Sequence, residues 1–473
     1  MALTMKAARI AGGCLGLAKS GSLRRANGLR RLEVPRAIQG MKKSTSTSTP
    51  FEDLDVGDED SVTDTTSSPT PTTTAVPAKV GVFTGGVEIP FTSHLHLIDP
   101  AHFPVWPVYR VLDNDGSVRA DAVEPELKPE LAVRIYENMV RLEAMDDIFY
   151  SAQRQGRMSF YAQAAGEEGV QMAGAAALEL EDIAFTQYRE PGILMWRGFK
   201  VQDFADQCFG NCHDLGKAGR QMPVHYGSED FHFQTVSSPL ATQIPQAVGA
   251  GYALKLSGKK NVAVCYFGEG AASEGDFHAA MMMAATRDVP IIFVCRNNGY
   301  AISTSVEEQY RGDGIVSRAP GYGMPSIRVD GNDVLAVYAA TAEARRLCLS
   351  ENKPVLMEAM TYRLGHHSTS DDASRYRSSS EVEEWKVEHH PIRRFRAYLQ
   401  RKGWWDDDKD RALGEKERQT VLNALEKAER KGKPSVDTMF EDVYKVMPPH
   451  LREQRDHLYA HMGRHPGKYE IKH

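Results

Sequence analysis

Two glycine-rich segments, each directly after an apolar run, carry groups able to bind a phosphorylated ligand. GEGAASEGD at 268–276 follows the run NVAVCYF, and RNNGYAIST at 296–304 follows PIIFVC. Gly268 and Gly270 allow the backbone to approach a bulky ligand closely. The helix expected after the first segment points its N-terminal amide groups at an anion. The two segments therefore predict a site for an anionic ligand.

The acidic residue between the two glycines changes the expected ligand. Glu269 would repel a bare phosphate, whereas Mg²⁺ accepts one or two protein oxygens together with phosphate oxygens. Asn298 offers a neutral amide oxygen to the same ion, and a main-chain carbonyl near Tyr300 offers another. A GEG segment alone is also typical of an ordinary strand-to-helix turn. Together with the asparagines after the next strand, it predicts a site for Mg²⁺ and a phosphorylated ligand.

A third polar segment, GHHSTSDDASRYRS at 365–378, holds candidates for several kinds of chemistry. Its histidines and aspartates could be acid/base groups or metal ligands, and its hydroxyls could accept phosphate. His366 and His367 are adjacent, so their side chains point in different directions, and no partner ligands lie at helical spacing. Zinc binding is therefore not predicted, while a solvated loop and an acid/base group both stay open.

Short apolar strands that alternate with helical patterns must position these segments. The strand candidates are 261–267, 290–295, 326–329 and 354–360. Their apolar runs are continuous, as expected for parallel strands buried on both faces. Helices expected at Glu274–Arg287 and Asp333–Ser350 complete βαβ units. The predicted fold class is α/β, a doubly wound parallel sheet flanked by helices, in which ligands bind at the carboxyl ends of the strands.

Composition divides the 473-residue chain into five predicted segments. The N-terminus is rich in Arg and Lys with one acid, Glu33, which is typical of a mitochondrial presequence; a disordered basic tail is the alternative. A long amphipathic helix is expected from Leu131. The segments are a mitochondrial presequence at 1–45, a disordered Ser/Thr/Pro-rich linker at 46–80, an extended N-terminal arm at 81–130, the α/β domain at 131–390 and a C-terminal helical segment at 391–473.

Charge and cysteine usage exclude several classes of protein. The net charge of -6 gives no general reason to expect nucleic-acid binding. No apolar run is long enough to span a bilayer, so no membrane anchor is predicted. The six cysteines form no disulfide framework or zinc-finger spacing, and Cys265 and Cys295 lie within apolar runs as small buried residues. A reducing compartment, the mitochondrial matrix, fits best.

The glycine-acid-glycine segment with NN after the next strand resembles the thiamin diphosphate/Mg²⁺ motif of thiamin-dependent enzymes. That family usually has GDG, so the longer side chain of Glu269 shifts the carboxylate relative to the metal. From about residue 80 onwards the chain resembles the α subunits of branched-chain 2-oxo acid dehydrogenases, the E1 component. The segments that carry this resemblance are SSPLATQIPQAVGAGYA, YFGEGAASEGD, RNNGYAIST, YRGDGI and RLGHHSTSDDASRYRS.

The resemblance implies a set of site residues, with the domain at 131–390 as the thiamin diphosphate-binding domain. His367 is implied as the catalytic acid/base group, and His366 as a loop anchor. Thiamin diphosphate is expected to contact Gln187, Tyr188, Arg189, Ser238, Gly268, Gly270, Ala271, Arg296 and His367. Mg²⁺ is expected on Glu269, Asn298 and Tyr300, and a structural K⁺ on Ser237, Pro239, Thr242 and Gln243. Without the family, SSPLATQ is equally a serine-capped helix start, and Arg189 equally a surface arginine in a turn.

The implied activity is thiamin-dependent oxidative decarboxylation of the branched-chain 2-oxo acids from Val, Leu and Ile. The acyl group passes to a lipoyl group of the E2 transacylase core. An E1 β subunit supplies the glutamate that activates the cofactor, which implies an α2β2 heterotetramer. Pro245, Gly249 and Ala253 share one helix face, which serves subunit packing in the family; a well-packed internal helix is the alternative. A pyruvate or acetoin dehydrogenase α subunit, and a non-catalytic phosphorylation-controlled binding subunit, are the competing functions.

Regulation is also implied for the segment at 365–378, through a kinase and a phosphatase. Ser368 and Ser378 match the family's phosphorylation sites. A phosphate on Ser368 would add up to two negative charges beside Asp371 and the cofactor diphosphate, disorder the loop and block lipoyl docking. Asp371 and Asp372 are expected to fix the loop, through Arg375 or Arg377. The sequence leaves open which branched-chain acid is preferred, where the presequence is cleaved and which residues contact the β subunit.

Overall fold

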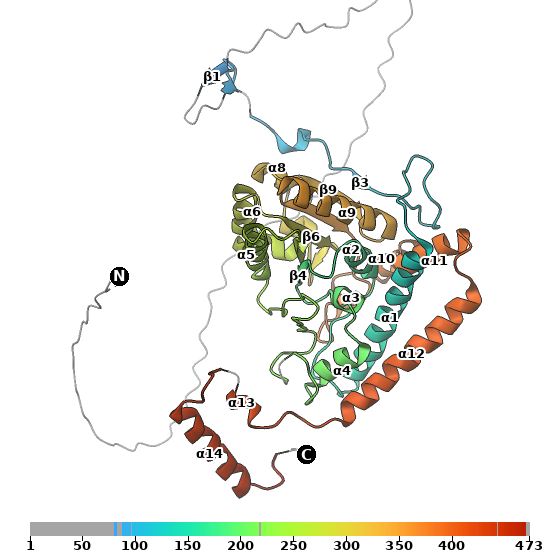
Figure 1. Cartoon of the computed structure of the whole chain (residues 1–473). Helices are drawn as coiled ribbons and strands as arrows, with labels where there is room; N and C mark the ends of the chain where they lie inside the picture. Colours follow the sequence, from blue (N-terminus) through green and yellow to red (C-terminus); the bar gives the residue numbers. More distant parts are fainter. Residues whose placement is uncertain (1–79, 83–87, 96, 217–218, 442, 470–473) are drawn as a thin grey trace, which may run out of the picture. The chain divides into compact units, whose positions relative to one another are not determined.

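The computed structural model of the chain describes residues 80–82, 88–95, 97–216, 219–441 and 443–469. The predicted presequence lies outside these residues, as does the predicted linker except for Val80. The chain divides into two compact units, Met1–Leu95 and His96–His473. The described part of the first unit holds an antiparallel pair, β1 (Val80–Val82) and β2 (Glu88–Pro90) (Figure 1).

Six parallel strands of the described residues form the central sheet, in the order β3-β9-β10-β6-β5-β4. The strands are β3 (Val108–Tyr109), β4 (Ile183–Phe185), β5 (Ala263–Gly268), β6 (Ile291–Asn297), β9 (Ser326–Asp330) and β10 (Val355–Met360). The four predicted strands are confirmed as β5, β6, β9 and β10. The two edge strands were not predicted, because two or three residues are too short to leave an apolar run in the sequence. One of them, β3, comes from the predicted extended arm.

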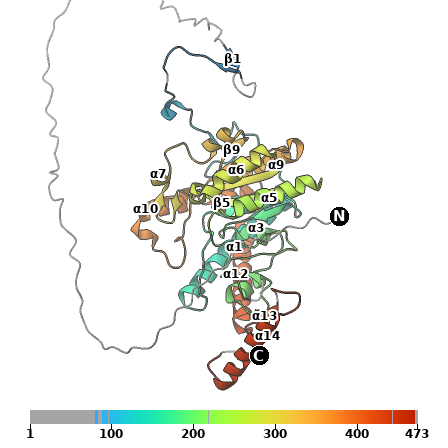
Figure 2. The same cartoon turned by 90° about the vertical axis from the view of Figure 1, so that its left-hand side faces the viewer.

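Helices cover both faces of this sheet, as the doubly wound prediction requires. Successive side chains of β5 point to opposite sides: Cys265 belongs to one buried cluster and Val264 to the other. The first cluster lies under α5 (Gln243–Leu256) and α6 (Gly275–Thr286), which lie side by side (Figures 1 and 2). The second lies under α2 (Glu168–Ala176) and α9 (Val334–Glu351). Both faces are buried, which explains the continuous apolar runs.

The long predicted helix is α1 (Pro129–Arg154), which starts with proline at its first position. It packs along α12 (Asp407–Arg430), as Figure 1 shows. Arg141 of α1 pairs with the buried Glu417 of α12 at 2.7 Å. The remaining helices are α3 (Pro191–Trp196), α4 (Val201–Phe209), α7 (Val306–Gln309), α8 (Ala319–Tyr322), α10 (Ser379–Glu388), α11 (Pro391–Arg401), α13 (Thr438–Glu441) and α14 (Pro449–Arg464).

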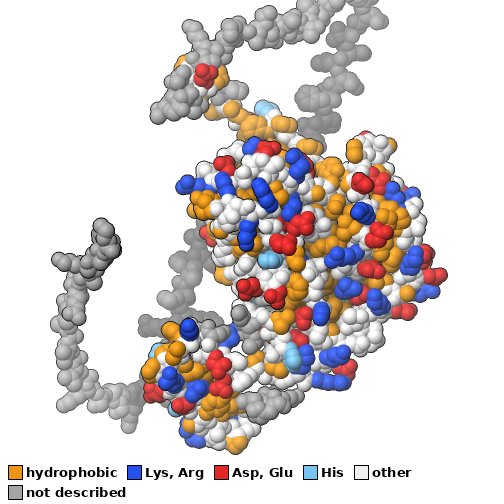
Figure 3. All heavy atoms as spheres, viewed as in Figure 1, with side chains coloured by type: hydrophobic (Ala, Val, Ile, Leu, Met, Phe, Trp, Pro, Cys, Tyr) orange, Lys and Arg blue, Asp and Glu red, His pale blue; other side chains and the backbone are white. Residues whose placement is uncertain are grey.

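Short elements complete the described structure. These are the hairpin β7 (Tyr300–Ala301) and β8 (Thr304–Ser305), and the 3₁₀ turns η1 (Pro100–His102), η2 (Glu269–Ser273), η3 (Val316–Arg318) and η4 (Ala373–Arg375). On the face shown in Figure 3, Lys and Arg side chains are interspersed with Asp and Glu. None of the described helices is both long and apolar enough to cross a bilayer.

Asp333 joins the N-terminus of α9 to the backbone that follows β3. One carboxylate oxygen caps α9 by accepting from the amides of Leu335 and Ala336, at 3.0 and 3.1 Å. The other oxygen accepts from the amides of Val111 and Leu112, at 2.7 and 2.6 Å. Asp333 is fully buried, so water cannot take its place as the hydrogen-bond acceptor of these four amides.

We expect Asp333→Ala to lower the free energy of unfolding by about 2–4 kcal/mol, because it leaves four buried amides without an acceptor. Asp333→Asn is the matched control: its single carbonyl oxygen still accepts from one pair of amides, so it should lose less. Urea unfolding followed by circular dichroism measures both. Equal stability of Asp333→Ala and the wild type would contradict the anchoring role.

Candidate active site

A cavity of about 470 Å³ lies at the carboxyl ends of β5 and β6, at the edge where the sequence predicted the ligand. Of the predicted site residues, its wall includes Gln187, Tyr188, Arg189, Ser238, Gly268, Glu269, Gly270, Ala271, Arg296, Asn298, Tyr300 and His367. The predicted K⁺ residues lie outside the wall. The fold therefore brings together residues that are up to 180 positions apart in the chain.

A buried arginine holds the floor of the cavity. Arg296, at the end of β6, is 2% exposed and pairs with Glu167 and with Glu190, the second pair at 2.5 Å. Burial opposes the charge of Arg296, but the two carboxylates outweigh it and raise its pKa. Burial likewise opposes ionisation of Glu167, yet Arg296 and Arg189 lower the pKa of Glu167 below its ordinary value. Arg296 and Glu167 are therefore both charged; together with Glu190 they form the Arg296 triad.

The Arg296 triad fixes two loops of the cavity. Glu190 accepts hydrogen bonds from the amides of Gln187 and Tyr188, at 3.0 and 3.2 Å. The side-chain oxygen of Gln187 in turn accepts from the amide of Gly268 at 2.8 Å. Glu167 accepts from the side-chain amide of Asn298 at 2.8 Å. The predicted contact of Arg296 with phosphate stays a prediction, because its guanidinium is already engaged by two carboxylates.

The acidic residue of the GEG segment has one carboxylate oxygen unused. Glu269 is 1% exposed; its Oε2 accepts from the amide of Asn298 at 3.4 Å, and its Oε1 is buried without a hydrogen-bond partner. Burial raises the pKa of this carboxyl. Asn298 keeps its amide oxygen nearby, accepting from the amide of Tyr300 at 3.2 Å. An unsatisfied buried carboxylate beside a neutral oxygen fits a hard divalent cation.

The two glycines of this segment serve different purposes. A Cβ on Gly270 would lie 2.6 Å from the Cβ of Ala301, so packing against β7 alone requires glycine there. A Cβ on Gly268 would meet only the Gln187 oxygen, at 3.8 Å, which is ordinary contact. Packing within the chain would thus allow a side chain at Gly268. Close approach of a ligand to the backbone is a reason for a glycine there.

His367 faces two guanidinium groups. Its Nδ1 lies 3.3 Å from Arg189 Nη2 and 3.4 Å from Arg363 Nη1, and both arginine atoms can only donate. Nδ1 must therefore accept, which leaves the ring hydrogen on Nε2. Burial, then the charges of Arg189 and Arg363, lower the pKa of His367 to about 3. The predicted acid/base group is a neutral imidazole with a donor Nε2–H.

The segment at 365–378 is anchored differently from the prediction. Asp371 accepts from the His367 amide at 2.7 Å and the Tyr376 hydroxyl at 2.5 Å, so neither Arg375 nor Arg377 holds it. Arg377 instead donates to the carbonyls of Arg363 and Gly365. Only Asp372 pairs with a predicted arginine, Arg375, at 3.3 Å in an exposed pair. Arg377 differs from the prediction because it is buried. Its guanidinium hydrogens need acceptors inside the protein, and the backbone carbonyls of Arg363 and Gly365 supply them.

The remaining predicted positions of this segment are also defined. His366 accepts from the amide of Ala373 at 2.9 Å, a contact consistent with a loop-anchoring role, which stays a prediction. Ser368 is 8% exposed, and its hydroxyl oxygen accepts from the amide of Ser370 at 3.3 Å. Ser378 is exposed and caps α10 by accepting from the amide of Glu381 at 3.1 Å.

The SSPLATQ segment gathers oxygen atoms before α5. The hydroxyl of Thr242 lies 3.1 Å from both the Ser237 hydroxyl and the Pro239 carbonyl. Gln243 is buried and donates its amide hydrogen to the carbonyl of Tyr266 at 3.2 Å, so Oε1 is the oxygen it can offer. The serine cap that the alternative required is not formed: no side chain caps α5, and Thr242 stands at that position.

Several cavity residues escaped the sequence prediction. Glu167, Glu190 and Arg363 support predicted residues, and His225 and Met222 line the wall. Glu190 lies within the singled-out QYREPG, so an acid beside Gln187 was a usable signal. Arg363 is the first residue of the quoted segment RLGHHSTSDDASRYRS, so its position was also available. Glu167, Met222 and His225 lie in segments with no motif, and only the tertiary structure brings them to the site.

Comparison with known proteins places this geometry in context. Residues 136–437 match the family model of the dehydrogenase E1 component. The chain is 54% identical over 388 residues to the human "2-oxoisovalerate dehydrogenase subunit alpha, mitochondrial", covering 82% of this chain and 87% of that protein. It is 50% identical over 390 residues to the Caenorhabditis elegans protein of that name, covering 82% and 90%. The Arabidopsis thaliana "2-oxoisovalerate dehydrogenase subunit alpha 2, mitochondrial" is 50% identical over 387 residues, covering 82% of each chain.

We expect the ring of His367 to show no titration between about pH 5 and 8 in the cofactor-free protein, because its pKa is about 3. Arg363→Gln removes one positive neighbour and should raise that pKa. NMR of the histidine Cε1–H signals measures both, with His367→Asn assigning the resonance. A wild-type midpoint near the ordinary 6.5 would contradict the role of the two arginines.

Proposed function

We propose that this chain, which belongs to the dehydrogenase E1 component family, is the α subunit of a mitochondrial branched-chain 2-oxo acid dehydrogenase. The activity is that of 3-methyl-2-oxobutanoate dehydrogenase (2-methylpropanoyl-transferring), EC 1.2.4.4. It comprises oxidative decarboxylation of a branched-chain 2-oxo acid and transfer of the acyl group to a lipoyl group. The observation that carries this conclusion is the close relation to 2-oxoisovalerate dehydrogenase α subunits, with the family match spanning every residue of the cavity wall.

The family implies thiamin diphosphate as the cofactor. When bound, it supplies a thiazolium carbon that adds to the keto carbon of the substrate and accepts the electrons left by carbon dioxide. The protein contributes orientation, charge and proton positions around that carbon. His367, with its hydrogen on Nε2, is able to donate a hydrogen bond into the cavity, and burial together with the charges of Arg189 and Arg363 keeps that ring neutral by lowering its pKa.

Mg²⁺ is the metal that the GEG segment fits best. The unpartnered Oε1 of Glu269, the amide oxygen of Asn298 and the main-chain carbonyl of Tyr300 would bind it, with diphosphate oxygens completing the shell. Arg189 and the loop at Gln187 and Tyr188 would lie on the diphosphate side. The glutamate in place of the usual aspartate is compatible with this role, since its free oxygen is buried at the cavity wall.

A structural K⁺ would take the oxygens of the SSPLATQ segment. Three of these oxygens lie close together: the Thr242 hydroxyl is 3.1 Å from the Ser237 hydroxyl and 3.1 Å from the Pro239 carbonyl. Gln243 offers a fourth oxygen, its Oε1. Ala241 within this turn has φ +66°, a left-handed conformation that turns the chain around the cluster. Such an ion would fix the start of α5 and, through it, the position of Ser238.

The family role implies a β subunit and an E2 core as partners. The face of α5 that carries Gly249 and Ala253 supports the proposal that this helix packs against another subunit, because both residues are exposed and a Cβ on Gly249 would meet nothing within 4 Å. Tyr252 and Leu256 extend this exposed face. An α2β2 heterotetramer would cover it, whereas a well-packed internal helix would not leave it open.

The substrate is tested with co-expressed α and β subunits. We expect kcat/KM for 2-oxoisovalerate to exceed that for pyruvate by about 100-fold, because two extra methyl groups add binding in an apolar pocket. The α chain alone should show no turnover, since the β subunit is proposed to complete the site. The matched control is Glu269→Gln, which keeps the shape of the side chain but removes the metal-binding charge. A preference for pyruvate would support the pyruvate or acetoin alternative instead.

Regulation by a kinase and a phosphatase at Ser368 and Ser378 completes the proposal. Ser368 is buried against the loop that carries His367, so the loop must open before a kinase reaches the hydroxyl. A phosphate of up to two charges could not return to that position beside Asp371. Ser378 is exposed at a helix N-terminus, where a negative charge is favourable.

We expect Ser368→Glu to abolish overall activity of the α/β complex while its circular dichroism spectrum stays unchanged. Ser368→Ala is the matched control and should retain activity, because it adds no negative charge to the loop. Steady-state turnover with lipoyl domain measures both variants. Normal turnover by Ser368→Glu would show that the loop tolerates the charge.

A further inference from the structure

Ser238, an expected cofactor contact, pairs on the cavity wall with His225, which has no role in the function proposed so far. The hydroxyl of Ser238 lies 2.6 Å from Nε2 of His225, and Nδ1 of His225 lies 3.1 Å from the carbonyl oxygen of Pro223. A carbonyl oxygen can only accept, so Nδ1 carries a hydrogen, and in the neutral ring Nε2 then accepts. The hydroxyl hydrogen of Ser238 therefore points at His225, and its oxygen presents lone pairs to the cavity.

The backbone around His225 is held in an unusual conformation. Val224 has φ +68°, which a β-branched residue rarely adopts, and it is 2% exposed. Gln207 of α4 clamps this turn: its oxygen accepts from the amide of Val224 at 3.1 Å, and its nitrogen donates to the carbonyl of Met222 at 2.6 Å. Backbone conformations of this kind persist only where the surroundings enforce them, and they concentrate at functional sites.

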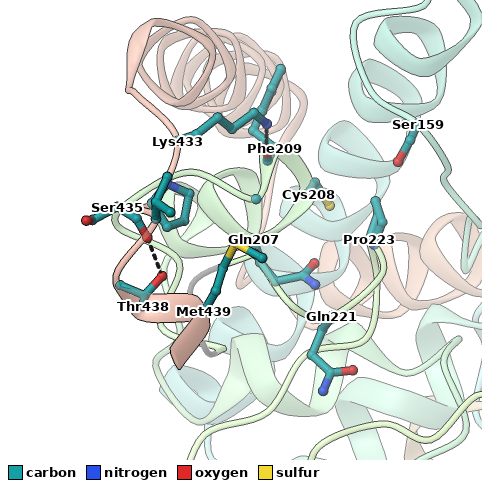
Figure 4. A pocket seen from close by; sticks show the side chains of 14 residues that line it. Ser159, Gln207, Cys208, Phe209, Gln221, Pro223, Lys433, Ser435, Thr438 and Met439 are labelled. Atoms are coloured by element: carbon teal, nitrogen blue, oxygen red, sulfur yellow. Dashed lines mark hydrogen bonds between the residues drawn. The ribbon is translucent and has the colours of Figure 1, made fainter. Parts of the chain in front are cut away.

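The clamp lies between two cavities. Gln207 and Pro223 line a separate cavity of about 410 Å³, next to Cys208 and the segment at Lys433 (Figure 4). Met222 and His225, from the same turn, line the active-site cavity instead. The turn is thus supported from behind by α4, and its histidine is directed toward Ser238.

We propose that His225 is a positioning residue that fixes the hydroxyl of Ser238 as a hydrogen-bond acceptor in the active site. The inference rests on the proposed function for the identity of the ligand, a 2-oxo acid. An acceptor fits a hydroxyl or amine hydrogen, such as that on the keto oxygen of the substrate once it is protonated. It does not fit a carboxylate, because a carboxylate oxygen can also only accept.

The pair is tested in the cofactor-loaded α/β complex by a double-mutant cycle. Ser238→Ala and His225→Phe should each lower kcat for 2-oxoisovalerate by about tenfold, the equivalent of one hydrogen bond, with less than about a twofold change in KM. The double variant should lose no more than Ser238→Ala alone, because His225 acts only through the serine. His225→Gln restores an acceptor and should recover part of the loss.

Two measurements separate positioning from simple structural support. Thiamin diphosphate affinity and α/β assembly should be unchanged in His225→Phe, whereas a structural role would weaken both. The ¹⁵N shift of His225 Nε2 reports an unprotonated nitrogen that accepts from Ser238, and it should move in Ser238→Ala. Additive losses in the cycle, or an unmoved shift, would overturn the proposal. A wild type inactive on branched-chain acids would instead overturn the proposed function, while the shift still decides the pair.

Discussion

The ion pairs of Arg296 with Glu167 and Glu190 are the interaction on which the site depends. Removing three charges from water is costly, and only their mutual attraction with further hydrogen bonds offsets that cost. The two carboxylates use their other contacts to hold the amides of Gln187 and Tyr188 and the side chain of Asn298. Three separate segments of the chain are therefore fixed by one guanidinium at the end of β6.

The charges around this triad are arranged for a ligand that carries both signs. Burial and the positive charges of Arg189 and Arg363 together lower the pKa of His367 and suppress its protonation. Glu269, directly after β5 ends, keeps a buried oxygen without a partner. A diphosphate would pair with the positive charges of Arg189 and Arg363, and a divalent cation would bind the free oxygen of Glu269. The proposed cofactor and metal would thus supply counter-charges to these residues.

Supporting contacts outside the cavity decide which way its groups point. His225 directs the hydrogen of Ser238 away from the cavity, and Arg377 holds the loop of His367 through backbone carbonyls. Buried donors with fixed partners cannot reorient without leaving an unsatisfied group, which makes their geometry rigid. The face of α5 at Gly249 shows the opposite condition: it is exposed, and a Cβ on Gly249 would meet no atom of the described chain within 4 Å.

The sequence by itself determined the parallel sheet, the strands β5, β6, β9 and β10, and the place of a cavity at the carboxyl ends of β5 and β6. Continuous apolar runs and the glycine-acid-glycine motif each involve residues that are neighbours in the chain. Such local patterns can be recognised in the sequence alone. The edge strands, the partners of Asp371 and the partners of Arg296 were decided only by the tertiary structure. Glu167 lies 129 positions from Arg296, and no spacing rule relates residues so far apart. Their pairing follows from burial, because a charge enclosed by the fold must find its counter-charge among whatever residues the packing brings to it.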